Sequence, residues 1–503
     1  MGFLLGIDSG LTVTKAALFD ENGRTVAIAR RSIQQSLPLP RHVERDMKVL
    51  WTETCSAIQE LLLVSGISPN DISAISQTAH GDGLYLLDKS HQPLGPGILS
   101  LDSRAIEEVA LWEANGTSDA MLRLSGQRPH VSSPAALLSW IKSNDPRRYG
   151  RIGAILSCKD WLSFCLTGVL GTDRTEASTA FSNVQTQHHE TAILERYDLK
   201  ELSDALPPVL HSAEVIGTVS REAAEKTGLR QGTPVATGLH DVTASSLGMG
   251  AHRQGCYALV AGTYSINQVV SDTPKTDSRW FCRNAIEPGL WNVMAISPAS
   301  TTNYEWFIKT FCSHEAAALE EQGASIHDVL AHEACASDVQ APIYHPFLFG
   351  SPYGAQASAS LIGLQGWQDR GAIVASILEG IVFNHKHHID DLDHVFSPTE
   401  VRVCGGVTRN PAVPQLFSDA LGRPVGVSDV DEPAAQGAAT CAGVATGIFS
   451  DLTEASEAFA PNVRKFEPDP KAQARLADRF GIYQEAASSL ASIWTQLEQA
   501  LVR

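Results

Sequence analysis

The sequence repeats one local pattern in its two halves, and this repeat limits the folds that the chain can adopt. An apolar run at residues 3–7 is followed by the polar turn Asp8-Ser9-Gly10 and a second run at residues 13–19. The same order returns at residues 257–261, 262–265 and 266–270. Short apolar runs bounded by glycine and small polar residues are typical of paired strands. This repeat indicates a duplicated fold, with one strand-turn-strand unit in each half of the chain.

Strand-like and helix-like segments follow one another along the chain. At 503 residues the chain is too long for one hydrophobic core. Helical periodicity begins at Asp46, covers residues 119–170, and returns at residues 373–388 and 468–501. Small residues dominate a further predicted helix at residues 433–443, which allows close backbone packing or the approach of a flat ligand. We therefore expect an α/β protein with more than one domain.

Composition excludes several classes of partner. The formal net charge of -18 argues against nucleic acid or an anionic membrane as the main partner. The sequence contains no run of about 20 apolar residues, so no membrane span is expected. The apolar N-terminal stretch is too short for a signal peptide. The nine cysteines form no CxxC pair, which is typical of free thiols in a reducing compartment. We expect a cytoplasmic protein.

The stretch around Asp241 combines a predicted strand with a predicted helix. Residues 233–238 are apolar with turn residues at their ends, and residues 242–248 are rich in Ala, Ser and Leu. Asp241 therefore lies at a strand-to-helix turn, where a carboxylate can cap a helix and project into a cleft. A purely capping role and a catalytic role both fit this position.

The first turn carries groups that suit a phosphate. Gly10 lets backbone N–H groups approach an anion, and Thr12, Thr14 and Lys15 can add donors. Asp8, at the end of the preceding strand, can hold a hydrated Mg²⁺. An ordinary hairpin turn has the same sequence features, so this motif alone leaves both interpretations open.

Three further polar clusters follow predicted strands. His80-Gly-Asp82-Gly lies between two strands and suits a ligand-facing loop. Asp102-Ser-Arg104 ends a strand, where Asp102 can cap the next helix or form a surface salt bridge with Arg104. A glycine turn at residues 404–410 precedes another predicted helix.

These motifs together resemble the FGGY carbohydrate kinases over essentially the whole chain. Six pieces stand in the order of that family: Gly6-Ile-Asp8-Ser-Gly10…Lys15, His42-Val-Glu44-Arg-Asp46, Asp102-Ser-Arg104, Gly238…Asp241…Gly248, Gly262-Thr263 and Gly405-Gly406…Asn410. The Gln-Met-His-Gly of xylulokinases is absent. The sequence His80-Gly-Asp82-Gly in its place is closer to the L-xylulose kinase and erythritol kinase branch, as are residues 86–104 and 346–351. Leu11 departs from the threonine that often follows the glycine of the first turn.

The resemblance implies a two-lobe actin-like ATPase fold, related to ribonuclease H, with a mixed five-stranded sheet and flanking helices in each lobe. Residues 1–247 would form the sugar-binding lobe and residues 248–503 the ATP-binding lobe. Asp241 would be the general base that takes the proton of the substrate hydroxyl. Phosphoryl transfer needs mainly positioning and charge neutralisation, so one base with Mg²⁺ and backbone donors is sufficient.

The resemblance also assigns binding roles. Asp8 and Asp241 would hold Mg²⁺. The nucleotide would contact Gly10, Thr12, Thr14, Lys15, Gly262, Thr263, Gly405, Gly406 and Asn410, and the sugar hydroxyls would contact His80, Asp82, Asp102, Arg104, His240 and Asp241. His240 stands where smaller residues are usual, and it either lines the substrate cleft or packs.

The implied activity is ATP-dependent phosphorylation of a small sugar, an open-chain ketopentose such as L-xylulose. A polyol kinase acting on erythritol or xylitol, a D-xylulokinase, a silent sugar sensor and a non-enzymatic actin-like ATPase module are the alternatives. Dimers are common in the family, so a homodimer is a further expectation.

Overall fold

Contacts within the chain define two compact units. The computed structural model describes residues 2–337, 340–459 and 462–501. Unit 1 comprises Met1–Gln254, Val270–Val293 and Val430–Pro461, and unit 2 comprises Gly255–Val269, Met294–Asp429 and Asn462–Arg503. The boundary predicted between residues 247 and 248 lies near the first point at which the chain passes from unit 1 to unit 2, after Gln254. Two later segments, residues 270–293 and 430–461, also group with unit 1.

The sheet of unit 1 has seven strands. Its order is β11-β12-β5-β1-β2-β3, and β13 pairs with β5. The strands are β1 (Phe3–Ser9), β2 (Val13–Asp20), β3 (Thr25–Ser32), β5 (Ile72–Ala79), β11 (Val215–Thr218), β12 (Pro234–Ala236) and β13 (Leu239–His240). β1 runs antiparallel to β2 and parallel to β5, which places Asp8 between Lys15 and Thr78.

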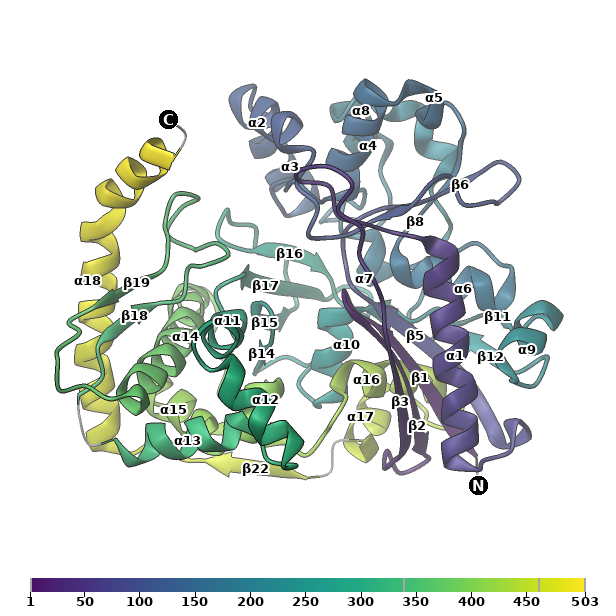
Figure 1. The fold of residues 1–503 in the computed structure, drawn as a ribbon. Coiled ribbons are helices and arrows are strands. Elements are labelled where there is room, and N and C mark those ends of the chain that lie inside the picture. Colours follow the sequence, from purple (N-terminus) through teal and green to yellow (C-terminus); the bar gives the residue numbers. More distant parts are fainter. Residues whose placement is uncertain (1, 338–339, 460–461, 502–503) are drawn as a thin grey trace. The chain divides into compact units, whose positions relative to one another are not determined.

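Helix α1 (Met47–Ser65) covers the strands that open the chain (Figure 1). Asp46 caps it by accepting hydrogen bonds from the backbone N–H groups of Lys48 and Val49, and it ends at Gly66, which adopts φ 65°. Both ends follow the preferred capping chemistry of helices. Its apolar face, including Leu50, packs with strand residues such as Leu5 in the main core of unit 1.

The remaining elements of unit 1 lie outside this sheet. They are β4 (Glu44–Arg45), β6 (Tyr85–Asp88), β7 (Gly97–Ile98), α2 (Ile106–Ala114), α3 (Thr117–Ser125), α4 (Pro134–Asn144), α5 (Pro146–Tyr149), β8 (Ile152–Leu156), α6 (Cys158–Thr167), β9 (Thr172–Asp173), α7 (Arg174–Ala177), α8 (Thr191–Arg196), β10 (Val209–Leu210), α9 (Arg221–Thr227), α10 (Asp241–Gly248), β16 (Phe281–Asn284), α16 (Pro433–Ala445) and α17 (Leu452–Phe459). Strand β8 interrupts the stretch 119–170, which the sequence predicted as helical.

Helix α16 belongs to unit 1 because its small residues let two backbones approach it. A Cβ on Gly437 would lie 2.0 Å from the carbonyl oxygen of Ala244 in α10, and a Cβ on Gly6 of β1 would lie 2.0 Å from that of Ala435. Such distances leave no room for a side chain. Of the two roles considered for this small-residue helix, the structure shows close backbone packing.

Unit 2 repeats the arrangement of the first strands. The strands lie in the order β17-β15-β14-β20-β21-β22. β14 runs antiparallel to β15 and parallel to β20, as β1 does with β2 and β5. The duplication inferred from the sequence is therefore confirmed in the strand pairing. The prediction of mixed sheets with flanking helices is also confirmed, but the sheet of unit 1 has seven strands rather than five.

The elements of unit 2 have the following bounds. The strands are β14 (Cys256–Ala261), β15 (Ser265–Ser271), β17 (Trp291–Ser297), β18 (Ile343–His345), β19 (Ser360–Ile362), β20 (Glu400–Cys404), β21 (Val425–Ser428) and β22 (Val463–Phe466). The helices are α11 (Thr302–Phe311), α12 (Ser313–Glu321), α13 (Ile326–Ala336), α14 (Arg370–Asp393), α15 (Ala412–Leu421) and α18 (Pro470–Leu501).

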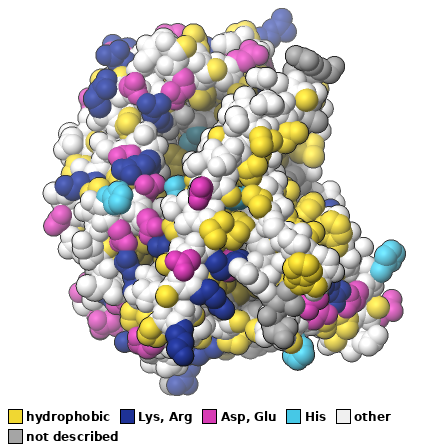
Figure 2. All heavy atoms as spheres, turned by 90° about the vertical axis from the view of Figure 1, so that its left-hand side faces the viewer, with side chains coloured by type: hydrophobic (Ala, Val, Ile, Leu, Met, Phe, Trp, Pro, Cys, Tyr) yellow, Lys and Arg dark blue, Asp and Glu magenta, His cyan; other side chains and the backbone are white. Residues whose placement is uncertain are grey.

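Apolar side chains are exposed on α18. Ile482, Ile493 and Leu497 are each about half exposed. Figure 2 views the side of the molecule at the left of Figure 1, where α18 lies, and shows hydrophobic side chains among the polar ones. Among the residues that the structure describes, no helix is long and apolar enough to cross a membrane.

Candidate active site

Asp241 is the first residue of α10 and follows β13 directly. β13 pairs in parallel with the end of β5, where the Thr78 hydroxyl donates to the carbonyl oxygen of Leu239 over 2.7 Å. Gly238 makes this approach possible, because it has φ 78° and a Cβ there would lie 2.0 Å from a β5 carbonyl oxygen. The predicted strand-to-helix position of Asp241 is confirmed.

The Asp241 carboxylate has the protonation properties of a general base. Its side chain is 33% exposed, and one oxygen accepts the backbone N–H of Val242 over 2.7 Å. Burial raises its pKa to about 7, with the negative charge of Asp8 adding to the rise and the N–H donors of Val242 and Gly81 opposing it. A base whose pKa lies near the working pH is effective in proton transfer.

Asp82 faces a buried arginine that the sequence gave no reason to select. Arg283 of β16 places Nη2 3.0 Å from Asp82 Oδ1, and His130 Nε2 lies 3.4 Å from the same oxygen. Burial would raise the pKa of Asp82, but Arg283 and His130 hold it well below its usual range. Asp82 itself adopts φ 56°, a conformation that its two flanking glycines help the loop to reach. Asp82 is therefore a fixed anion beside Asp241.

His240 lies between this ion pair and Asp241. Its Nε2 is 3.3 Å from Arg283 Nη1, and its Nδ1 is 3.3 Å from Asp241 Oδ1. Burial, followed by the charge of Arg283, lowers the pKa of His240 to about 4. The imidazole is thus neutral at physiological pH.

A second group of charges surrounds Asp8. Lys15 Nζ lies 2.7 Å from Glu432 Oε2 and 3.4 Å from Asp8 Oδ2, and Arg30 Nη2 lies 2.6 Å from Glu432 Oε1. Burial raises the pKa of Asp8, and the charge of Lys15 opposes that rise. Glu432 was not predicted, because it arrives from just before α16 and stands in no recognisable motif.

The donor set around Asp8 fits a magnesium ion held largely by another molecule. Within the described ranges, no group of three or more His, Cys, Asp or Glu side chains could hold a metal ion. Mg²⁺ in kinases is commonly bound by one or two carboxylates together with substrate phosphates. Asp8 and Asp241, whose charges influence each other, match that requirement.

The first turn presents only some of its predicted donors. The Gly10 N–H donates to the carbonyl oxygen of Val13, and Thr12 is exposed in the turn. Thr14 instead faces the core, with its hydroxyl 3.4 Å from that of Thr54 in α1. This placement does not support the predicted contact between Thr14 and a nucleotide.

Arg45 explains why the motif at residues 42–46 accompanies the first turn. Its side chain is buried, and its guanidinium donates to the carbonyl oxygens of Gly10 and Leu11. These bonds orient the turn, because the side chain of Arg45 holds the backbone carbonyl oxygens of the turn in place.

His80 also faces the protein interior. Its Nε2 lies 3.2 Å from the hydroxyl of Tyr85, and burial together with the charge of Arg45 lowers its pKa to about 3. A neutral histidine bonded to a buried tyrosine packs beneath the loop that carries Asp82. Its predicted contact with substrate stays a prediction.

Asp102 and Arg104 form a buried pair rather than a surface salt bridge. Arg104 Nη2 lies 2.8 Å from Asp102 Oδ2 and 2.7 Å from Glu44 Oε1, while Asp102 also accepts the backbone N–H of Val43. Asp102 does not cap α2, which begins at Ile106. The motifs at residues 42–46 and 102–104 are therefore joined to each other, and the predicted substrate contacts of Asp102 and Arg104 stay predictions.

The corresponding turn of unit 2 holds Gly262 and Thr263. The carbonyl oxygen of Gly262 accepts the backbone N–H of Thr301 over 3.1 Å and its hydroxyl over 2.6 Å. The Thr302 hydroxyl lies 3.5 Å from the carbonyl oxygen of Thr263. The residues at the start of α11 thus hold the turn by donating hydrogen bonds to its carbonyl oxygens.

In the glycine turn at residues 404–410, one glycine is required by its close contacts, and the other has open space where a side chain would stand. Gly405 adopts φ 121°, and a Cβ there would lie 2.1 Å from the carbonyl oxygen of Ala261. No atom lies within 4 Å of a Cβ on Gly406. Asn410 accepts the backbone N–H of Ala412 at the start of α15. The open space beside Gly406 is consistent with a ligand that approaches the backbone.

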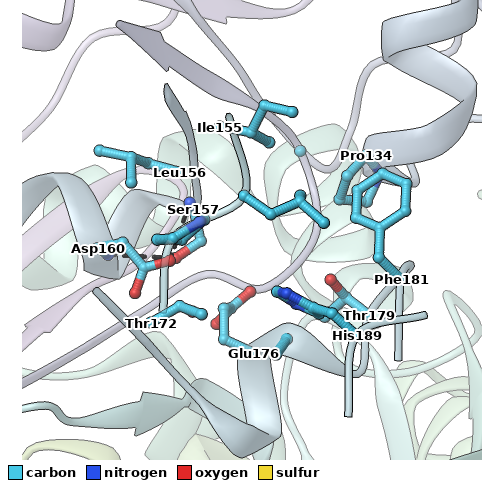
Figure 3. A pocket seen from close by; sticks show the side chains of 14 residues that line it. Pro134, Ile155, Leu156, Ser157, Asp160, Thr172, Glu176, Thr179, Phe181 and His189 are labelled. Carbon is cyan, nitrogen blue, oxygen red and sulfur yellow. Dashed lines mark hydrogen bonds between the residues drawn. The ribbon is translucent and has the colours of Figure 1, made fainter. Parts of the chain in front are cut away.

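A cavity of about 40 Å³ lies within unit 1 and has Gly83, the residue after Asp82, in its lining (Figure 3). Ile155, Leu156 and Phe181 are among the apolar residues that line it, and the side chains of Glu176 and His189 lie next to each other at one side. One Glu176 oxygen has no hydrogen-bond partner, and burial raises its pKa well above its usual value. The cavity is large and polar enough to hold ordered water.

Comparison with known structures defines the class of protein. A ligand-bound xylulose kinase from Lactobacillus acidophilus superposes with a TM-score of 0.89 at 24% identity, covering 99% of this chain and 100% of that one. This likeness shows the two-domain actin-like ATPase fold.

Sequence comparison then gives the family. Residues 3–248 match the N-terminal domain and residues 257–446 the C-terminal domain of the FGGY family of carbohydrate kinases. The chain belongs to this family, and it is an ATP-dependent carbohydrate kinase. It is 30% identical over 501 residues to an L-xylulose/3-keto-L-gulonate kinase of Escherichia coli (strain K12), covering 99% of both chains. It is 28% identical over 514 residues to an erythritol kinase of Brucella abortus (strain 2308), covering 98% of this chain and 97% of the relative.

Proposed function

We propose that this enzyme transfers the γ-phosphoryl group of ATP to a hydroxyl of an open-chain ketopentose such as L-xylulose, with Asp241 as the general base. Asp241 takes the proton of the attacking hydroxyl, a new bond forms between that oxygen and the γ-phosphorus, and the bond from the γ-phosphorus to ADP breaks. The observation that carries this assignment is the position of Asp241 at a strand-to-helix turn, where its carboxylate is 33% exposed and burial together with the charge of Asp8 raises its pKa to about 7.

The charges around Asp241 favour an uncharged substrate with several hydroxyls. Asp8 and Asp82 lie close enough to raise its pKa, and Arg283 is already paired with Asp82. Carboxylate oxygens accept hydrogen bonds from hydroxyls, which suits a polyhydroxy compound. The name of the Escherichia coli relative supports L-xylulose, and that of the Brucella relative supports an alditol as the second candidate.

The nucleotide and magnesium assignments follow the family. We propose that Asp8 and Asp241 help to hold Mg²⁺, which neutralises phosphate charge when bound. Gly10, Thr12, Lys15, Gly262 and Thr263 would contact the phosphates. The adenosine would lie against Gly405, Gly406 and Asn410. A cytoplasmic location and a homodimer complete the proposal.

ADP release with Mg·ATP across a substrate panel tests the substrate. The panel contains L-xylulose, D-xylulose, L-ribulose, D-ribulose, erythritol, xylitol, D-arabitol and glycerol. We expect L-xylulose to raise turnover far above the other compounds. A preference for erythritol would establish the polyol alternative, and a preference for D-xylulose would establish a D-xylulokinase.

Asp241→Asn tests the base. The amide keeps the size of the side chain but cannot accept the proton, so kcat should fall by at least about 100-fold. Thermal unfolding and ATP binding, measured on the same preparation, should stay close to those of the unaltered enzyme. A variant that keeps its normal kcat would exclude Asp241 as the base.

A further inference from the structure

Arg283 is a buried cation with a fixed orientation. Its Nε donates to Gln127 Oε1 over 2.8 Å, and its Nη2 donates to Asp82 Oδ1 over 3.0 Å. Its side chain is only 3% exposed, and the guanidinium also lies 4.9 Å from the centre of the Phe281 ring. Bonds to two different neighbours therefore hold the guanidinium plane in place.

The contact between Arg283 and His240 determines which imidazole nitrogen carries the proton. Arg283 Nη1 lies 3.3 Å from His240 Nε2. A guanidinium has donors only, so Nε2 must offer its lone pair. A neutral imidazole that accepts at Nε2 carries its hydrogen on Nδ1. The arginine thus selects one of the two tautomers.

The Nδ1–H group of that tautomer faces the proposed base. His240 Nδ1 lies 3.3 Å from Asp241 Oδ1 and is buried without a well-aligned hydrogen bond to any described residue. Catalytic hydrogen bonds are often long or poorly aligned before substrate binds. Among the described residues, the acceptor recorded on this side of the ring is the carboxylate of Asp241.

The ring of His240 is packed closely against the loop that carries Asp82. A Cβ on Gly81 would lie 1.8 Å from His240 Nε2, so the ring lies directly against the backbone of that glycine. The backbone N–H of His240 donates to the hydroxyl of Thr175 over 2.9 Å. Gly81 also donates a backbone hydrogen bond to Asp241. The loop, the ring and the carboxylate form one packed unit.

We infer that His240 and Arg283 are positioning residues for Asp241: Arg283 fixes the tautomer of His240, and His240 uses its Nδ1–H to orient the Asp241 carboxylate toward the substrate hydroxyl. This inference rests on the proposed role of Asp241 as the base.

Two substitutions of His240 separate positioning from packing. In His240→Asn the amide nitrogen takes the place of Nδ1 and keeps a donor toward Asp241. In His240→Leu the side chain keeps its volume but has no donor. We expect kcat to fall by about 10- to 100-fold in His240→Leu, with a smaller change in the KM for sugar, and to recover most of this loss in His240→Asn. Equal kcat values for the two folded variants would overturn the inference.

The tautomer of His240 can also be measured directly, by a method that does not depend on enzyme activity. In enzyme labelled with ¹⁵N-histidine, the His240 signals, assigned by their absence from His240→Asn, should show hydrogen on Nδ1 at neutral pH. Hydrogen on Nε2 would overturn the inference. Removing the pair in Asp82→Asn/Arg283→Met, which leaves no unpaired charge, should raise the share of the Nε2–H tautomer relative to the unaltered enzyme. An unchanged share would show that Asp241 alone selects the tautomer and would overturn the role of Arg283.

The substrate panel and the Asp241→Asn variant distinguish a failure of the proposed base from a failure of the proposed positioning role. If Asp241→Asn retains activity, the assignment of the base fails. If Asp241→Asn is inactive while His240→Leu keeps its full kcat, the base stands and the positioning role fails.

Discussion

Lys159 and Asp173 hold their charged groups 3.3 Å apart, with neither side chain exposed to solvent. Asp173 Oδ2 also accepts the hydroxyls of Thr175 and Ser212, each over 2.7 Å. The Thr175 hydroxyl in turn accepts the backbone N–H of His240. A buried charge network therefore supports the backbone immediately before the proposed base.

Removing the cation from this network should strongly destabilise unit 1. In Lys159→Met, Asp173 and Asp160 lose the ammonium group that lies 3.3 Å from the one and 2.6 Å from the other. Leaving buried charges without a partner costs about 3–5 kcal/mol. Urea unfolding should show a loss of this size.

Lys226→Met provides the matched control for that measurement. Lys226 pairs with Glu222 on the surface of α9, where both side chains are at least half exposed. Exposed pairs contribute at most about 1 kcal/mol. A loss in Lys159→Met no larger than that in Lys226→Met would contradict the importance of the buried network.

Glu176 should make the protein less stable as the pH rises. Its pKa in the folded protein is raised well above 4.5 by burial and by the neighbouring carboxylates of Asp160, Asp173 and Asp82, with Lys159 opposing them. The unfolded chain then loses the proton more readily than the folded protein. The stability that the neutral carboxyl group contributes is complete below about pH 4.5 and is lost as the pH rises toward the folded-state pKa.

Glu176→Gln should remove this dependence. Between pH 5 and pH 8 the variant should gain stability relative to the unaltered protein, by at most about 1.4 kcal/mol per pH unit. Chemical unfolding at several pH values measures the difference. Glu107→Gln, an exposed position of α2, should show no comparable trend. Parallel curves for Glu176→Gln and the unaltered protein would show that Glu176 ionises as readily when folded as when unfolded.

Local pattern was enough to predict the parts of the site that one segment builds. The start of α10 at Asp241, the cap at Asp46 and the first strand pair all follow from residues adjacent in sequence. The alternation of side chains along β2 also contains a signal that was not used. Thr14 shares the buried face with Ala16, so it points away from Lys15 and from the turn.

Residues that reach the site through tertiary packing could not be predicted in this way. Arg283 lies 201 positions from Asp82, and Glu432 lies 417 positions from Lys15. Neither belongs to a short motif, and each is brought into place by the packing of β16 or α16 within unit 1. Likewise, no local pattern reveals that Asp102 and Arg104 are buried against Glu44 rather than exposed.

Two helical glycines should respond in opposite ways to alanine. Gly481 lies inside α18 with open space where a Cβ would stand, so Gly481→Ala should stabilise the protein by about 0.5–1 kcal/mol. Gly437→Ala in α16 would force a Cβ to within 2.0 Å of the carbonyl oxygen of Ala244 and should destabilise it. Thermal unfolding compares the two. A stabilising Gly437→Ala would contradict the close packing of α16 on α10.

The two glycines of the second turn should differ in their effect on ATP. Gly405→Ala places a Cβ 2.1 Å from the carbonyl oxygen of Ala261 and strains a backbone at φ 121°, so the turn must move. Calorimetry should show ATP affinity falling by about tenfold or more, with the sugar KM nearly unchanged. Gly406→Ala meets no protein atom within 4 Å, so the fold should tolerate it. Weaker ATP binding in Gly406→Ala, without any loss of stability, would place the nucleotide directly against this residue, whereas unchanged ATP binding in both variants would remove the turn from the proposed adenosine site.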